Sequence, residues 1–182
     1  MPRFRFCAEG RPRLLSGGRP LDQWRTTHPE VADVRHRLSA SPWRTGTVAA
    51  MDVSYEWRGE FANAEVDALH AEAFEHELFP DFDWRKRMRD HSLGWVVARA
   101  GDELVGFVNV AWDGAGHALV LDTIVARRAR RQGIGKELVA ICVEHARAAD
   151  CEWLHVDFDD HLRSFYFDAC GFTPTNAGLI RL

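Results

Sequence analysis

Residues 127–136, with the sequence RRARRQGIGK, place the chain's densest positive charge directly beside two glycines. Four arginines occupy five positions, and Gly133 and Gly135 follow them. The first backbone amides of a helix lack partners within the helix, and the helix dipole is positive there. Glycines let a ligand approach such amides closely, so the stretch predicts a phosphate or pyrophosphate site. A solvated basic loop with a glycine turn would explain the same residues without a ligand.

Two common phosphate motifs are excluded by single residues. A P-loop needs a glycine at position 130 and Ser or Thr at position 137, where this chain has Arg130 and Glu137. A dinucleotide-binding fingerprint needs a third glycine at position 138, which is Leu138. The glycine pair therefore belongs to a different kind of anion site.

The stretch lies between two elements of different periodicity. The apolar run LVLDTIV, residues 119–125, precedes it and is typical of a buried strand. Apolar residues then recur at helical spacing from Ile134 until about Asp150. The sequence CEWLHVDF, residues 151–158, predicts another strand, so strand, helix and strand form a right-handed crossover with parallel strands.

The motif Arg/Gln-x-x-Gly-x-Gly/Ala between a strand and a helix, here residues 130–135, resembles the signature of the GNAT superfamily of acetyl-CoA-dependent N-acetyltransferases. The strand LVLDTIV upstream and the sequence FYFDACGF downstream also resemble the order of elements in that family. The resemblance covers about residues 53–182 and does not extend to residues 1–50.

The resemblance implies acetyl-CoA as co-substrate and no metal. It implies that three residues at the end of one strand pair with the pantetheine arm, and that the amides after them hold the pyrophosphate. The strand from Cys151 should diverge from the Asp122 strand to make room. The cofactor-binding residues are then Ile124, Val125, Ala126, Arg130, Arg131, Gln132, Gly133, Ile134, Gly135 and Lys136.

Acetyl transfer to an amine requires a neutral amine, a donor for the developing oxyanion and a route for the leaving thiolate. Asp122 is our candidate base, because a carboxylate inside an apolar strand needs partners or a shifted pKa. A structural Asp122 paired with an arginine or a backbone amide is an equal alternative. The resemblance implies that a backbone N–H near Val125 serves the oxyanion.

The resemblance also implies a tyrosine four positions before the glycine of the terminal Gly-Phe pair, where it protonates the thiolate. Counting back from Gly171 reaches Phe167, and Tyr166 is one position earlier. One residue rotates a side chain by about 100° around a helix. Either a one-residue bulge restores Tyr166, which we favour as the acid, or no side chain protonates the thiolate.

The sequence HVDFDDH contains a second polar cluster. His155, Asp157 and Asp159 alternate, so in a strand they share one face. They suit a proton relay, an acceptor pocket or a solvated strand end. A metal site is the least favoured reading, because nothing here enforces a closed ligand set.

The fold class is α/β in the broad sense, an α+β mixed sheet with helices on both faces. An antiparallel meander precedes the crossover, because short Gly-containing turns separate strands at 95–99, 104–112 and 118–125. Further elements are expected before and after these strands. They are a strand in DVSYEW, a helix capped by Asn63 with Val66, Leu69, Ala73 and Phe74 on its apolar face, helices over 84–90 and 162–170, and a closing strand in GLIRL.

Residues 1–50 differ from the rest in composition and are predicted to be a flexible arm ahead of a domain at 51–182. Nine arginines against four acidic residues give the arm a charge of +5, so the net charge of −4 leaves −9 from Met51 on. A negative domain favours a cationic amine as acceptor, either a small molecule or a peptide.

No run of the sequence suits a membrane span or a convincing secretory signal, and the four cysteines have no CxxC spacing. We therefore expect a cytoplasmic protein with reduced thiols. Nucleic-acid binding by the arginine-rich arm ranks low, because no docking motif accompanies it. The oligomeric state stays open, a homodimer included.

The sequence thus predicts an N-acetyltransferase that moves an acetyl group from acetyl-CoA to a primary amine by direct attack in a ternary complex. The alternative is a module of the same fold that binds acyl-CoA without catalysis, because both would keep the glycines. The two hypotheses differ in whether any amine causes release of CoA.

Overall fold

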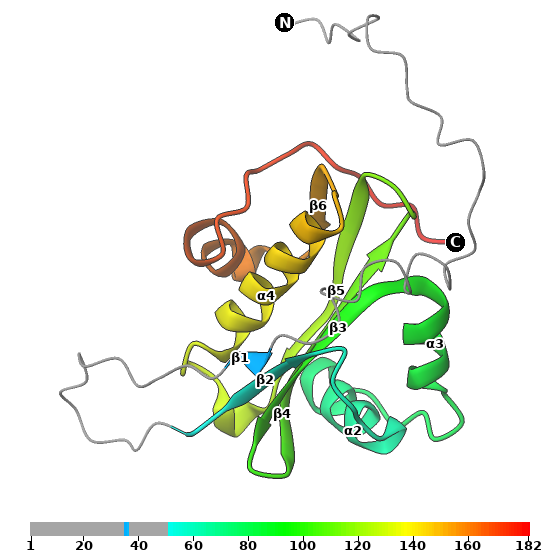
Figure 1. Cartoon of the computed structure of the whole chain (residues 1–182), viewed down its shortest axis with the longest axis vertical. Helices are drawn as coiled ribbons and strands as arrows, with labels where there is room; N and C mark the ends of the chain where they lie inside the picture. Colours follow the sequence, from blue (N-terminus) through cyan, green and yellow to red (C-terminus); the bar gives the residue numbers. More distant parts are fainter. Residues whose placement is uncertain (1–34, 37–50) are drawn as a thin grey trace, which may run out of the picture.

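The computed structural model describes residues 35–36 and 51–182, which form a mixed sheet with helices on both faces (Figure 1). The expected arm at 1–50 therefore lies outside the described residues, apart from Arg35–His36. Six strands are arranged in the order β1 to β6. They are β1 (Arg35–His36), β2 (Ser54–Trp57), β3 (Ser92–Ala100), β4 (Glu103–Trp112), β5 (His117–Val125) and β6 (Trp153–Val156).

The first five strands are antiparallel neighbours, and β6 runs parallel to β5. The predicted meander and crossover are confirmed. Tight turns around Gly101 and Gly114 need positive φ angles of 60° and 80°, which explains the glycines there. In the described part of the chain, no helix has both the length and the apolar character that crossing a membrane requires.

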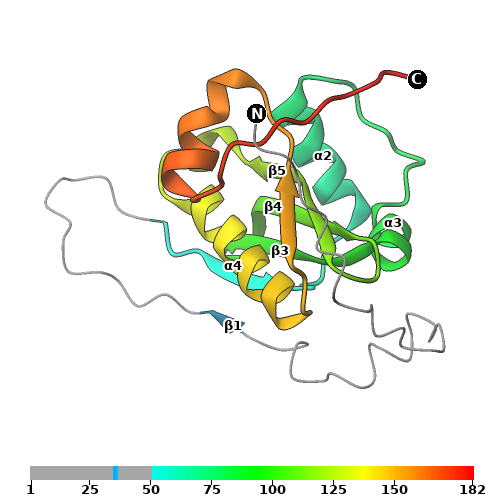
Figure 2. The ribbon, with the colours of Figure 1, turned by 90° about the horizontal axis from the view of Figure 1, so that it is seen from above.

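The helices divide between the two faces of the sheet (Figure 2). The helices α2 (Asn63–Phe74) and α3 (Trp84–His91) cover one face, and α4 (Ile134–Ala148) covers the other. Neighbouring residues of β4 show the division, because Phe107 packs on Phe61 beside α2 whereas Gly106 faces Ile134 and Leu138 of α4. Both helical layers therefore share one core through the sheet.

The start of α2 differs from the prediction. The N-cap is Ala62, whose N–H donates to Glu65 Oε2 at 2.8 Å, and Asn63 is the first helical residue. The Asn63 side chain instead accepts from the N–H of Arg85 at 2.9 Å and donates to Asp83 at 3.0 Å, so it joins α2 to α3. Phe74, predicted on the apolar face, is 54% exposed, because its ring packs on His70 at the helix surface with centroids 4.5 Å apart and does not enter the core.

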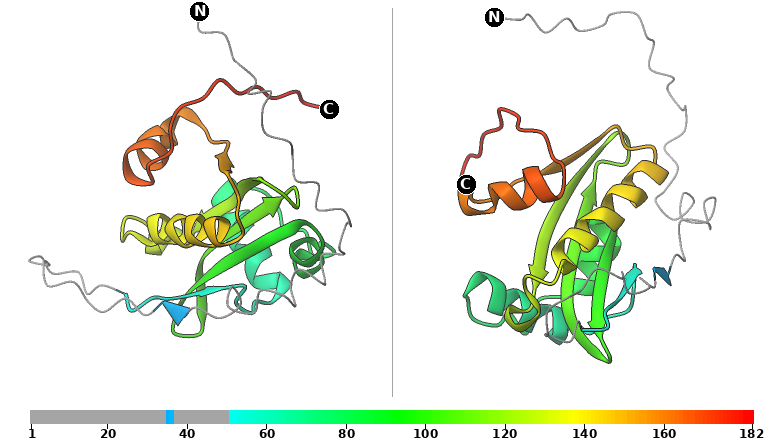
Figure 3. Two further views of the ribbon diagram at one scale, coloured as in Figure 1. Left: turned by 45° about the horizontal axis from the view of Figure 1, so that its top comes forward. Right: turned by 90° about the vertical axis from the view of Figure 1, so that its left-hand side faces the viewer.

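The C-terminal region also differs. In place of a regular helix over 162–170 there is a 3-10 turn, η3 (Asp160–Leu162), and a π-helix, η4 (Ser164–Ala169), which lies beside α4 (Figure 3). The expected strand in GLIRL is absent from the structure, where Leu179 and Ile180 are 82% and 88% exposed. A hydrophobic pattern of five residues was insufficient to make this segment pair with β6.

Gly94 lets a tryptophan lie flat on the sheet. A Cβ atom at Gly94 would be 2.1 Å from the Trp57 ring, and the other face of that ring stacks on His145 of α4 with centroids 4.1 Å apart. We expect Gly94→Ala to lower the free energy of unfolding by about 1–3 kcal/mol, because the ring cannot move without disturbing α4. Gly116→Ala is the matched control, since its Cβ would be 3.9 Å from the nearest side chain. Equal denaturation midpoints for the two variants would contradict this packing.

Candidate functional site

A bulge interrupts the pairing of β5 with β4. Phe107 pairs with Ile124 and Asn109 pairs with Leu121, so Asp122 and Thr123 together lie opposite Val108. Asp122 has a φ of 53°, in the left-handed region that a non-glycine residue rarely occupies. Bulges redirect side chains and are common beside functional sites. Here the bulge turns the carboxylate of Asp122 towards α2 and α3.

The pairing of β5 with β6 ends just before this bulge. The last matched residues are Val120 and Val156, and β5 continues for five residues to Val125. This is the divergence that the resemblance implied. Among the described residues, the outer edge of β5 from 121 to 125 has no strand beside it.

The backbone of Val125 faces this open edge. Val125 lies opposite Gly106, and the next amide, Ala126 N–H, donates to Val105 O at 2.9 Å. In an antiparallel ladder this pattern points the N–H and C=O of Val125 away from β4. Ile124 pairs with Phe107 and is buried, as is Ala126. Of the three predicted pantetheine-binding residues, Val125 therefore presents both backbone polar groups to a partner strand.

The open edge of β5 is followed, after a loop of residues 126–133, by the start of α4. Gly133 is the N-cap with a φ of 86°, and the first bond inside the helix runs from Glu137 N–H to Gly133 O at 3.1 Å. The amides of Ile134, Gly135 and Lys136 therefore have no acceptor within the helix. The predicted pyrophosphate-binding amides thus lie where the helix dipole is positive.

The four arginines have two different roles. Arg127 and Arg128 pair with Glu75 at 2.7 Å and Glu103 at 2.5 Å, so these two hold the turn after β5. Arg130 Nε donates to Val125 O at 3.1 Å, which ties the loop to the open edge. Arg131 has a φ of 62° and forms no ion pair with the described residues. Gln132 accepts from the N–H of Met51 at 3.4 Å.

Tyr166 lies close to the open edge because η4 is a π-helix. The N–H of Cys170 bonds to Phe165 O at 3.0 Å, a five-residue step that accommodates one extra residue in the turn. This is the one-residue bulge that we considered for Tyr166. The ring is buried and stacks on Phe158 with centroids 4.6 Å apart, whereas Phe167 lies beneath the guanidinium of Arg163.

The hydroxyl of Tyr166 lies beside Thr123 in the bulge. Burial raises the pKa of the Tyr166 hydroxyl, and the interaction with Thr123 opposes the rise only in part. The contact falls short of good hydrogen-bond geometry, since Thr123 Oγ is buried without a hydrogen-bond partner among the described residues. Two hydroxyls thus lie at the point where β5 loses its neighbour, and one of them lacks a partner.

Asp122 is an ion-paired carboxylate. Its oxygens lie 2.9 Å from a guanidinium nitrogen of Arg87 on α3 and 3.6 Å from Nε2 of His70 on α2. Of the two readings of this residue from the sequence, the structure supports the one that pairs it with an arginine. The sequence alone did not identify Arg87, which is 35 positions away, or His70.

His70 and Arg87 also line a cleft of about 360 Å³. The other lining side chains are aromatic, and Phe79 and Phe82 are 50% and 42% exposed. Trp84 contributes a buried ring, which lies 5.4 Å from the guanidinium carbon of Arg87. The cleft is therefore lined mostly by aromatic rings, and its two polar residues, His70 and Arg87, are the ones that contact Asp122.

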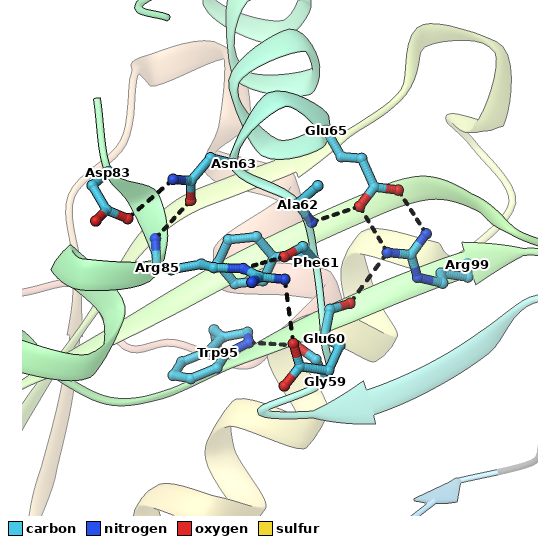
Figure 4. Close-up of polar contacts among 10 residues, drawn as sticks. All are labelled: Gly59, Glu60, Phe61, Ala62, Asn63, Glu65, Asp83, Arg85, Trp95 and Arg99. Carbon is cyan, nitrogen blue, oxygen red and sulfur yellow. Dashed lines mark hydrogen bonds and ion pairs between the residues drawn. The ribbon is translucent and has the colours of Figure 1, made fainter. Parts of the chain in front are cut away.

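Polar contacts fix the two helices that carry this cleft (Figure 4). Arg99 on β3 holds Glu65 of α2 through two bonds of 2.9 and 3.0 Å. Arg85 of α3 donates to Phe61 O at 2.6 Å, and Trp95 Nε1 donates to Gly59 O at 2.8 Å. The corner between β2 and α2 is thus bonded to both β3 and α3. The loop between α2 and α3, residues 75–83, supplies Phe79 and Phe82 to the remaining wall of the cleft.

The second predicted cluster does not share one strand face. The strand β6 ends at Val156, so Asp157 and Asp159 lie beyond it, and both are exposed together with His155. His155 contacts His117 at 2.8 Å, away from both carboxylates. No group of three or more potential metal ligands is present in the described part of the chain. The exposure of these side chains favours a solvated strand end among the interpretations of the cluster.

A sequence profile of the acetyltransferase (GNAT) family matches residues 53–172, and the chain belongs to this family. The comparison of this chain with curated proteins found no match. A putative acetyltransferase from Deinococcus radiodurans is 23% identical with a TM-score of 0.56, over 75% of this chain and 93% of the other.

Two further solved structures share the fold. Glucosamine-6-phosphate N-acetyltransferase from Arabidopsis thaliana is 14% identical with a TM-score of 0.55, over 70% of this chain and 97% of the other. An aminoglycoside acetyltransferase from an uncultured soil metagenomic sample is 18% identical with a TM-score of 0.57, over 71% and 94%. At these identities the similarity establishes the fold, and the acceptors in those names belong to those proteins.

We expect acetyl-CoA to raise the Tm of the unaltered chain, and we expect Gly133→Asp to abolish that rise. Ligand at about 100 times its Kd should stabilise the chain by roughly 2.7 kcal/mol. Aspartate tolerates the left-handed conformation and suits a helix N-cap, so the loss should come from its charge beside the phosphates. Gly133→Asn is the matched neutral control and should keep most of the shift. If the two variants bind acetyl-CoA equally, the pyrophosphate site lies elsewhere.

Proposed function

We propose that the chain is an N-acetyltransferase that moves an acetyl group from acetyl-CoA to a primary amine by direct attack in a ternary complex. The observation that carries this proposal is the open edge of β5. It joins a stretch of backbone without a partner strand, a helix start with unpaired amides, a buried tyrosine hydroxyl and an aromatic cleft. Each feature matches one requirement of acetyl transfer.

The co-substrate would lie along this edge. The C=O of Val125, which also accepts from Arg130 Nε at 3.1 Å, suits an amide N–H of a pantetheine arm in the manner of an added strand, and the N–H of Val125 is left for the acetyl oxygen. The amides of residues 134–136, with the charges of Arg130, Arg131 and Lys136, suit a pyrophosphate. The unpartnered Thr123 Oγ offers one more polar contact in the same place. Bound acetyl-CoA would supply a thioester whose carbonyl carbon is open to attack.

The bulge gives the acetyl oxygen a donor. The backbone N–H of Val125 is directed to the open edge by the ladder of β4 and β5 and needs no movement to donate. A fixed donor of this kind stabilises negative charge that develops on the acetyl oxygen during attack. Val125 therefore contributes through its backbone, and its side chain is replaceable by another apolar residue.

Tyr166 suits the role of the acid that protonates the leaving thiolate. Burial raises the pKa of its hydroxyl above the ordinary value of 10.0, so the group stays protonated through neutral pH. We expect Tyr166→Phe to lower kcat by roughly 10–100-fold, with little change in acetyl-CoA affinity. Phe167→Leu is the control, because Phe167 packs under Arg163. An unchanged kcat, measured where chemistry limits the rate, would remove the acid role.

The cleft beside Asp122 is our candidate acceptor site, and its lining favours an amine with a flat apolar group. Phe79 and Phe82 expose ring surface there, and none of the lining residues is acidic. The charge of −9 from Met51 on would attract a cationic amine at long range, while the aromatic walls would select its body. We also propose a cytoplasmic location, which rests on the sequence alone.

The deciding experiment measures thiol release from acetyl-CoA with a panel of primary amines. The panel should include 2-phenylethylamine and n-propylamine, which differ chiefly in the ring. We expect the ring-bearing amine to have the higher kcat/KM, and Phe82→Ala to raise its KM about tenfold while leaving n-propylamine unchanged. Equal effects on both amines would remove the aromatic selection. Saturable acetyl-CoA binding without thiol release for any amine would favour the alternative, a non-catalytic acyl-CoA-binding module.

A further inference from the structure

Two histidines and a carboxylate form a line from the loop after α2 to the bulge of β5. Nδ1 of His76 lies 2.5 Å from the carbonyl oxygen of Glu77. Nε2 of His76 lies 2.6 Å from Nδ1 of His70, and Nε2 of His70 lies 3.6 Å from Oδ1 of Asp122. The line connects the part-exposed ring of His76 with the nearly buried carboxylate of Asp122.

The contacts determine where the protons lie. A carbonyl oxygen only accepts, so His76 must donate to Glu77 from Nδ1. A neutral His76 then has a lone pair on Nε2, and the 2.6 Å contact requires His70 to donate from Nδ1. A neutral His70 therefore has its lone pair on Nε2, the nitrogen that faces Asp122. Each neutral ring has one tautomer that fits.

The lone pair of His70 is left available. A separation of 3.6 Å is too long for a direct hydrogen bond, so Asp122 does not occupy Nε2. His70 also lines the aromatic cleft, so an amine bound there would lie beside the imidazole ring. A carboxylate beside the ring stabilises the imidazolium that forms when Nε2 takes a proton. Asp122 is thus placed to assist a base, and its ion pair with Arg87 at 2.9 Å keeps it in place.

We propose that His70 is the base that accepts the proton of the acceptor amine, and that His76 passes this proton to solvent. The inference rests on the proposed function, since it deepens the acceptor side of that reaction. It assigns Asp122 to stabilising the imidazolium, in place of the base role that its position in the sequence suggested. His76 acts through His70 and is a positioning and relay residue.

The step balances as a proton transfer. The N–H bond of the ammonium breaks, and its electron pair stays on the amine nitrogen, which becomes the nucleophile. A new N–H bond forms at Nε2 of His70, whose Nδ1 proton passes to Nε2 of His76. The Nδ1 proton of His76 leaves to water or a buffer base, so one proton has moved from the amine to solvent and both rings now carry their proton on Nε2. Loss of the His70 Nε2 proton to water in the emptied cleft, return of the His76 Nε2 proton to His70 Nδ1 and uptake of a proton at His76 Nδ1 restore the starting tautomers.

The charged groups around His70 come from each neighbouring element. Asp122 faces it from β5, Arg87 of α3 forms an ion pair with that carboxylate, and His76 contacts it from the loop. Trp84 and Phe74 pack on the ring with centroids 4.9 and 4.5 Å away, and neither carries charge. The ring is thus held between a carboxylate and a second imidazole, and aromatic rings pack against it.

The arrangement can be tested without turnover. In ¹⁵N-labelled protein above pH 8, NMR should show both His70 and His76 as Nδ1–H tautomers, with the His70 proton shifted downfield by the short bond to His76. His70→Gln should remove that proton, and His91→Gln, at an exposed histidine of α3, should leave it unchanged. An Nε2–H tautomer at either histidine would overturn the proposal, whatever the catalytic result.

Kinetics then test the direction of proton flow. His70→Gln should lower kcat/KM by about 100-fold or more and change the pH dependence of kcat/KM, because the base is gone. His76→Gln keeps an acceptor for His70 but cannot relay a proton, so it should lower kcat in dilute buffer. Added imidazole should restore that rate, and stronger buffer bases should restore more of it. His91→Gln is the control.

The outcomes separate the proposal from the proposed function. A normal pH profile in His70→Gln, or a His76→Gln rate insensitive to buffer base, would overturn the relay. The acetyl-CoA-induced rise in Tm, kept in each variant, shows that the fold and the co-substrate site are intact. If the unaltered chain releases no thiol with any amine, the proposed function fails, and the NMR measurement still decides whether the hydrogen-bonded line exists.

Discussion

The site depends on one extra residue in β5. Because Asp122 and Thr123 share a single partner on β4, the strand changes direction where its pairing with β6 stops. The same residue sends a carboxylate to one face of the sheet and leaves backbone groups at the open edge. A regular ladder would direct Asp122 differently and would leave β5 and β6 free to pair further. The positive φ of Asp122 is costly for a non-glycine residue, so the surrounding structure must hold it, and the ion pair with Arg87 is one of the contacts there.

The two sides of the bulge are supported in different ways. On the side of α4, the contacts are apolar and close, with Tyr166 buried among aromatic rings. On the side of α2 and α3, a frame of charged hydrogen bonds around Arg85 and Arg99 fixes the helices (Figure 4). The loop between those helices carries the exposed rings of Phe79 and Phe82. Acceptor preference can therefore change within the loop while the frame keeps its geometry.

The sequence predicted the elements well where periodicity or glycines were strong. The meander, the crossover and the helix after Gly133 all lie within a few residues of their predicted bounds. Local rules failed where a competing contact decided the outcome. Asn63 has the right chemistry for a cap, but a bridge to α3 uses its side chain, and a carboxylate bonds the N–H of Ala62 instead. The GLIRL pattern was too short to determine a pairing.

The sequence predicted the co-substrate side of the candidate site but not the partners of Asp122. The glycine motif identified the start of α4, and counting residues around Tyr166 raised the need for an extra residue that the π-helix supplies. The partners of Asp122 were not predictable, because His70 and Arg87 come from elements with no local signal for chemistry. Such contacts depend on how α2 and α3 cross the sheet, which hydrophobic patterns leave undetermined.

Gly135 lies where the start of α4 packs against the π-helix η4. A Cβ atom there would be 3.2 Å from the ring of Phe165, the residue immediately before Tyr166. The glycine therefore does more than open the helix start to a ligand, since it also sets how closely η4 packs against α4. An alanine at 135 would require the Phe165 ring to shift by a few tenths of an ångström, and a bulkier side chain would move η4 outward together with Tyr166. The size of this one residue thus bears on the helix start that would hold the co-substrate and on the position of the tyrosine hydroxyl together.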